Sequence, residues 1–141
     1  MFDIRYVTMA DKPFWFTLDP HLSEKEFNAK VRNNQGYVIG VDNQPIGILR
    51  YNLFWDNTPF VTLIKLQEAY HGKGFGSQAM NHWESEMQEL GYKLVMTSTQ
   101  SDEQAQHFYR KLGYVDSGCL LLNDKPAEIF FVKWQGIIMH N

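Results

Sequence analysis

The sequence predicts an α/β (α+β) fold: a single domain over residues 1–141, with a mixed, mostly antiparallel central sheet of about six to seven strands and helices on both faces. Three β-like runs joined by short polar turns predict a meander, and a glycine-rich turn then leads into an amphipathic helix. The strand after this helix is expected to run parallel to the strand before it, because a helix makes the crossover. With 141 residues, 44% of them hydrophobic, the chain suits one core.

Strand signals dominate the first half of the chain. Apolar, β-branched and aromatic runs bounded by turn residues predict strands at 2–8, 36–41, 46–54 and 60–67. Residues 10–18 predict a short helical or irregular segment. Ser23 and Glu26 have the spacing of a capping box, which predicts a helix from there to about residue 33. The turns between the last three runs are rich in Asn, Asp and Pro, which favours hairpins.

The second half alternates helices with strands. Residues 77–90 predict an amphipathic helix that Gly91 ends as a C-cap. Its apolar stripe consists of Ala79, Met80, Trp83, Met87 and Leu90. Asp102 is predicted to cap a second helix over residues 103–112. Strands are expected at 93–99, 114–122 and 127–134, the last two as a hairpin.

Charge and composition exclude several classes of function. The net charge is −3 without any block of like charges, so the basic stripe of a nucleic-acid-binding protein is absent from the sequence. Residues 1–7 resemble neither a signal peptide nor a membrane span. Cys119 is the sole cysteine, which excludes an internal disulfide and a multi-cysteine zinc site, and its apolar neighbours predict a core position. We therefore expect a cytoplasmic protein without a metal.

A glycine turn at residues 71–77 is the strongest functional signal. The first amides of a helix lack intrahelical partners and carry the positive end of the macrodipole, so they attract anions. Gly72, Gly74 and Gly76 let the backbone turn sharply and approach a ligand closely, and Lys73 adds a positive charge. The alternating glycines match neither a P-loop nor a dinucleotide fingerprint. The pattern favours phosphate binding, although such turns also occur in proteins that bind nothing.

Two segments resemble motifs of the GNAT superfamily of N-acetyltransferases. Residues 66–76, LQEAYHGKGFG, resemble its acyl-CoA-binding motif Q/R-x-x-G-x-G/A, which follows a strand. Residues 105–114, AQHFYRKLGY, resemble its A-x-x-F-Y-x-K-x-G-F segment. The resemblance spans roughly residues 35–134. It implies a GNAT-like sheet with splayed fourth and fifth strands, acetyl-CoA as co-substrate and direct acetyl transfer to a primary amine.

The resemblance also implies where acetyl-CoA binds. The pantetheine arm is expected to pair with backbone in the gap between the splayed strands, and the pyrophosphate to reach the glycine turn. The implied cofactor-binding residues are Leu66, Gln67, Glu68, His71, Gly72, Lys73, Gly74, Phe75, Gly76, Ser77 and Asp102. Three of them depart from the family pattern: His71 replaces the usual Arg or Gln, Glu68 a common Pro, and Asp102 a frequent Asn.

Two residues are candidates for proton transfer. Neutralising an amine with a pKa of about 10.4 at neutral pH costs roughly 4 to 5 kcal/mol, which a general base lowers. Glu68 is the candidate base because it follows the strand next to the expected thioester, although it equally suits an exposed loop carboxylate. Tyr109 falls at the family's general-acid position, where a phenol could protonate the leaving thiolate. The alternative for Tyr109 is a packing role on the sheet.

Aromatic residues on the segments that set acceptor specificity in the family are the candidate acceptor site. They are Trp15, Tyr51, Trp55 and, as a carboxylate, Asp56, with Phe14, Phe16 and Phe54 nearby. Such a wall could hold an amine by cation–π and ionic contacts, or its rings could simply fill the core. The expected partner is a small-molecule or peptide amine, and a homodimer is compatible with the resemblance. A non-catalytic acyl-CoA-binding module or sensor, and a nucleotide-binding protein, are the alternatives.

Overall fold

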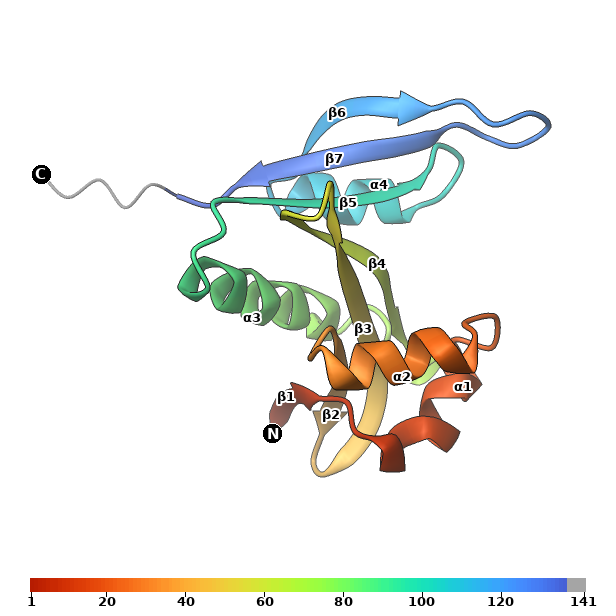
Figure 1. Ribbon diagram of the computed structural model, residues 1–141, viewed down its shortest axis with the longest axis vertical. Helices are drawn as coiled ribbons and strands as arrows, with labels where there is room; N and C mark the ends of the chain where they lie inside the picture. The colour runs from red at the N-terminus through yellow and green to blue at the C-terminus, as the bar shows by residue number, and fades with distance from the viewer. Residues whose placement is uncertain (137–141) are drawn as a thin grey trace, which may run out of the picture. The chain divides into compact units, whose positions relative to one another are not determined.

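The computed structural model describes residues 1–136, and its chain course is drawn in Figure 1. Over these residues the elements are β1 (Phe2–Tyr6), η1 (Met9–Asp11), α1 (Lys12–Leu18), α2 (Glu24–Arg32), β2 (Gly36–Val41), β3 (Gln44–Phe54), β4 (Thr58–Leu66), η2 (Glu68–Tyr70), α3 (Phe75–Glu89), β5 (Leu94–Gln100), α4 (Ala105–Lys111), β6 (Val115–Leu120) and β7 (Glu128–Trp134). The two η elements are single turns of 3₁₀ helix. No helix in the described range is long and apolar enough to cross a membrane.

The strands form a seven-stranded mixed sheet in the order β1-β2-β3-β4-β5-β7-β6. β4 and β5 are parallel, with Phe60 opposite Met96 and Val61 opposite Thr97, whereas β1–β2, β2–β3, β5–β7 and β6–β7 are antiparallel. This confirms the predicted fold class. The chain packs as two compact units, one formed by Met1–Asn52 with Thr62–Trp83 and the other by Leu53–Val61 with the chain from Glu84 onward. A single domain over residues 1–141 stays a prediction.

The first unit packs α1 and α2 on a fully buried apolar cluster. Its members are Val7, Trp15, Phe27, Val38 and Ile48. α2 begins as predicted, because the Ser23 hydroxyl accepts a hydrogen bond from the Glu26 amide at 3.1 Å. A polar group anchors the same region: Asp19 accepts from the Trp15 indole at 3.1 Å and from Arg50 at 2.8 Å. Trp15 has no exposed surface, so its burial gives no support to its predicted role in acceptor binding, which stays a prediction.

Two tight turns join the strands of the meander. Asp42 and Asn43 have φ values of 52° and 65° between β2 and β3, and Trp55 and Asp56 have φ values of 55° and 62° between β3 and β4. Two successive residues with positive φ are the requirement of a type I′ hairpin turn. Asn and Asp tolerate this region well, whereas a tryptophan there is strained.

The second unit places α4 on one face of β5 and β7. Thr97 and Phe131 are opposite one another and buried, and the Phe131 ring lies 5.9 Å from the ring of Tyr109. The residues that alternate with Thr97 along β5 and with Phe131 along β7 point to the opposite face of the sheet. Glu84 is buried and accepts from Tyr114 at 2.8 Å and from Lys133 at 2.9 Å. These two hydrogen bonds connect Glu84 of α3 with Tyr114, just before β6, and with Lys133 on β7.

Four details differ from the sequence-based expectations. α3 begins at Phe75, two residues earlier than predicted, and ends before Leu90, which is 61% exposed. α4 begins at Ala105, so Asp102 lies in the preceding turn and does not cap it. Cys119 is exposed on β6 rather than buried. β6 is an edge strand with every residue exposed, which an apolar sequence run alone does not reveal.

Replacing the α2 cap tests the role of local sequence in this fold. Ser23→Ala removes the acceptor of the Glu26 amide, so the free energy of unfolding is expected to fall by about 1 kcal/mol. Urea denaturation measures it. Ser101→Ala, in an exposed turn, serves as the control and should change stability by less than about 0.5 kcal/mol. Equal losses in both variants would contradict the capping role.

Candidate active site

The segment between β4 and α3 folds back on the end of β4. The Gln67 amide donates to Ile46 O at 2.7 Å, and the His71 amide donates to Glu68 O at 3.1 Å. The His71 ring contacts Leu66 O through Nε2 at 2.9 Å. The Leu66 carbonyl and the Gln67 amide, both expected to face pantetheine, are thus already hydrogen-bonded within the protein. His71, which departs from the family pattern, therefore closes this loop on the strand end.

The glycine turn has the conformation that the sequence predicts for an anion site. Gly72 and Gly74 have φ values of 73° and 85°, and a Cβ built on either would meet nothing within 4 Å. The turn is thus open as well as left-handed. The Gln78 amide makes the first intrahelical bond, to Gly74 O at 3.1 Å. The amides of residues 75–77 precede it and are the donors that a helix start offers to an anion.

Side chains around the turn divide into packing and exposed residues. Phe75 packs against Phe2 and Tyr70, with ring centroids 6.2 and 6.1 Å apart, so its side chain anchors the start of α3. Lys73 is exposed and lies 5.9 Å from the centre of the Tyr70 ring. Glu68 is exposed in η2. Its position fits a loop carboxylate as well as a base, and the base role stays a prediction.

Tyr109 lies in the second unit, on α4, with only 5% of its surface exposed. Burial raises the pKa of Tyr109, with smaller contributions from the negative charges of Glu103 and Glu128, whereas a hydrogen bond with Thr97 acts in the opposite direction. Thr97 also donates to Val61 O at 3.1 Å, where β4 and β5 pair. The phenol is therefore protonated at neutral pH and connected through one side chain to the parallel strand pair.

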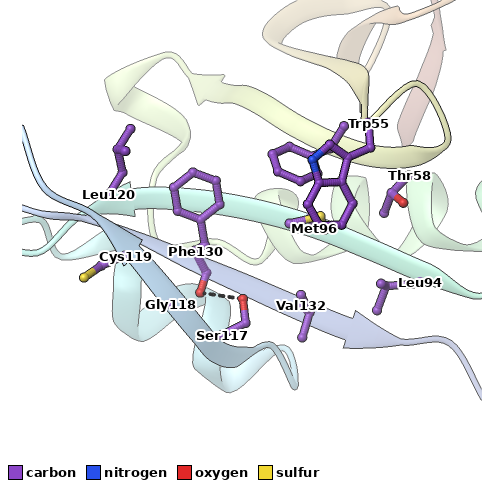
Figure 2. A pocket seen from close by; sticks show the side chains of 11 residues that line it. Trp55, Thr58, Leu94, Met96, Ser117, Gly118, Cys119, Leu120, Phe130 and Val132 are labelled. Carbon is purple, nitrogen blue, oxygen red and sulfur yellow. Dashed lines mark hydrogen bonds between the residues drawn. The ribbon is translucent and has the colours of Figure 1, made fainter.

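A cavity of about 400 Å³ opens on the opposite face of the second unit. Its wall includes Phe54, Trp55, Met96, Leu120, Phe130 and Val132, drawn in Figure 2. Trp55 is thus the one predicted acceptor residue among the cavity's lining residues. Asp56 is exposed in the adjoining turn, and Tyr51 is buried in the first unit with 6% of its surface exposed.

Sequence reasoning missed three residues of the second unit. Thr97 bonds to Val61, and the Ser98 hydroxyl donates to Glu128 Oε2 at 2.6 Å. Their strands were predicted, and their alternation places Ser98 and Glu128 on the face opposite Thr97. The missing signal is the register of β5 against β7, which brings Ser98 to Glu128, 30 residues further along the chain, and which local sequence pattern does not encode.

The comparisons with known proteins identify the class. The sequence model described as the acetyltransferase (GNAT) family matches residues 3–114. This chain belongs to that family and is an acetyltransferase. No curated protein matches the chain.

Solved structures share the fold at low sequence identity. A GNAT acetyltransferase from Bacillus cereus ATCC 10987 has 20% identity and a TM-score of 0.80, covering 96% of this chain and 98% of its own. The ribosomal-protein-S18-alanine N-acetyltransferase of Escherichia coli has 15% identity and a TM-score of 0.76 over 100% of both chains. A GNAT acetyltransferase from Elizabethkingia anophelis with acetyl-CoA bound has 16% identity and a TM-score of 0.72, covering 94% and 97%.

A glycine substitution tests whether the turn is a ligand cradle. Gly74→Ala forces an L side chain to φ 85°, so stability should fall by about 1 to 2 kcal/mol. If a ligand fills the open space that the new Cβ enters, the Kd of acetyl-CoA should rise by roughly tenfold or more in calorimetry.

Gly91→Ala is the matched control, because Gly91 also has a positive φ, 97°, with nothing within 4 Å of an added Cβ. It should lose similar stability and keep the wild-type Kd. A Kd that rises equally in both variants would assign the effect to strain and not to the cradle.

Proposed function

We propose that this protein transfers the acetyl group of acetyl-CoA directly to a primary amine. The observation that carries the proposal is Tyr109, a buried phenol with a raised pKa beside Thr97, which lies at the parallel pairing of β4 and β5. A protonated donor at that position suits a reaction that releases a thiolate, whose conjugate thiol has an ordinary pKa of about 8.5. Family membership supports the acetyl donor.

The glycine turn supports the proposed binding mode of acetyl-CoA. Gly72 and Gly74 leave the backbone open, and the amides of residues 75–77 head a helix of 15 residues. A pyrophosphate placed there would meet several N–H donors and the positive end of the helix dipole, with Lys73 at the rim. Asp102, in an exposed turn, adds no positive charge and has no such supporting contact.

The proposed reaction balances without a covalent intermediate on the protein. The neutral amine nitrogen attacks the thioester carbonyl, the C–N bond forms and the C–S bond breaks. Tyr109 gives its proton to the departing sulfur, and the proton that the amine loses passes to a base, for which Glu68 is the proposed residue. The products are an amide and free coenzyme A, and solvent restores the proton of Tyr109. Cytoplasmic location and a homodimer stay predictions.

Removing the phenol hydroxyl tests the acid role. Tyr109→Phe should lower kcat for amine acetylation by roughly 100-fold while leaving the Kd of acetyl-CoA nearly unchanged. Thiol release from acetyl-CoA, followed with a thiol-reactive dye, measures the rate. Because burial raises the pKa of Tyr109, the alkaline limb of kcat in the wild type should lie above pH of about 10, the ordinary phenol value.

Tyr114→Phe is the matched control, since Tyr114 is also buried and also loses a hydrogen bond, to Glu84. It should lose stability and keep kcat. An equal fall of kcat in the two variants would contradict the acid role of Tyr109. Acetyl-CoA binding without thiol release from any amine would instead support the non-catalytic module.

A further inference from the structure

We propose that the cavity of the second unit binds the acceptor, and that the acceptor is a small primary amine with an aromatic or branched apolar body, which binds as an ammonium ion at Glu128 and loses its proton before the nitrogen attacks. This inference rests on the proposed acetyltransferase function and adds its substrate class. It keeps Trp55 from the predicted acceptor residues and replaces Trp15 and Tyr51 with residues on the face of β5, β6 and β7 that α4 leaves uncovered.

The cavity is built from apolar and aromatic side chains. Phe54 lies against Phe60 and Phe130, with ring centroids 5.8 and 6.3 Å apart, and the Phe60 and Phe130 rings are 5.7 Å apart. Phe54 and Phe130 line the cavity and pack against buried Phe60, and the paired residues Met96 and Val132 of β5 and β7 line it as well. Figure 2 shows the Trp55 indole at one side of this space and the Phe130 ring at another. The volume, about 400 Å³, suits a small molecule.

The lining selects against strongly polar acceptors. Among the described residues that line the cavity, none carries a charged side chain. Two of its hydroxyl groups already have partners: Ser117 donates to Phe130 O at 3.2 Å, and Thr58 donates to Asn57 at 2.8 Å. A polyamine or an amino sugar would lose water here without gaining hydrogen bonds. The apolar body of an acceptor loses no hydrogen bonds to water when it enters the cavity, and its removal from water is favourable.

A carboxylate stands next to this apolar space. Glu128, Phe130 and Val132 alternate along β7 and so point to one face. Glu128 lies about 7 Å along the strand from Phe130, and its partner Leu120 on β6 also lines the cavity. The Ser98 hydroxyl holds Glu128 through Oε2, at 2.6 Å. A carboxylate accepts at both oxygens, so Glu128 offers a bound ammonium an oriented acceptor on the same face of β7 as Phe130.

The backbone at Trp55 supports a binding role for its ring. Trp55 has a φ of 55°, a region that a bulky side chain rarely adopts, and 80% of the residue is exposed. A strained, exposed tryptophan contributes little to folding. Strain of this kind persists where another requirement overrides it, and ligand contact is a common one. A glycine at position 55 would adopt this φ without strain. Trp55→Gly is therefore expected to increase the stability of the protein and to weaken ligand binding.

The test compares 2-phenylethylamine with spermidine as acceptors in the thiol-release assay, and measures binding of 2-phenylethylamine by calorimetry without acetyl-CoA. The wild type should acetylate 2-phenylethylamine with a kcat/KM at least tenfold above that for spermidine. Trp55→Gly should raise the Kd of 2-phenylethylamine at least fivefold while raising Tm, and Trp55→Phe should restore the binding.

Glu128→Gln should raise the KM for 2-phenylethylamine at least tenfold. Glu89→Gln, on the exposed side of α3, is the control and should match the wild type.

The outcomes separate this inference from the proposed function. Turnover of spermidine or a peptide amine that is unaffected by Trp55→Gly and Glu128→Gln would overturn the acceptor site and leave the acetyltransferase standing. Absence of thiol release with every amine would overturn the proposed function, and the calorimetry would still decide whether the cavity binds 2-phenylethylamine. A wild-type dimer in sedimentation that Phe130→Asp converts to monomer would assign this face to a second copy of the chain and overturn the proposal.

Discussion

The parallel pairing of β4 with β5 is the constraint on which the rest of the structure depends. Two parallel neighbours cannot be joined by a hairpin, so the chain must cross over between them, and α3 is the crossover. This requirement places a turn at the carboxyl end of β4 and the start of a helix directly after it. The glycine turn and the first amides of α3 thus follow from strand direction, and the proposed anion binding follows from the turn.

The same pairing organises the second unit. Thr97, on β5, donates a hydrogen bond to Val61 O on β4 and lies beside Tyr109 of α4. One face of β5 therefore supports the proposed acid, and the alternation of the strand leaves its other face to Met96 and Ser98. The proposed chemistry and the proposed acceptor site lie on the two faces of one strand. A change in register by one residue would exchange them.

Local pattern predicted the parts of this arrangement that depend on neighbours in sequence. The stripe of α3 was correct for Ala79, Met80, Trp83 and Met87, which are fully buried, and Ser23 caps α2 as its spacing predicts. The glycine turn was also found, because its conformation is set by a few adjacent residues. The predictions that Leu90 belongs to the apolar stripe of α3 and that α4 begins at residue 103 were wrong. Helix ends depend on packing as well as on local signals.

Long-range contacts limited the prediction of the site. Trp15 and Tyr51 are core residues, whereas Trp55 is exposed, yet the three are equally aromatic in the sequence. The Ser98–Glu128 hydrogen bond depends on the register of strands 30 residues apart. The pKa of Tyr109 is raised by burial of its side chain and, to a smaller extent, by the negative charges of Glu103 and Glu128. None of these properties follows from hydrophobic periodicity.

The central proposal is that acetyl-CoA binds at the glycine turn of residues 71–77, at the start of α3. Amide chemical shifts of the ¹⁵N-labelled protein, recorded during titration with acetyl-CoA, test it most directly. The largest shifts are expected at the amides of residues 72–77, because these N–H groups are the proposed donors to the pyrophosphate. Saturable shifts confined to other segments, with the amides of 72–77 unchanged, would contradict it.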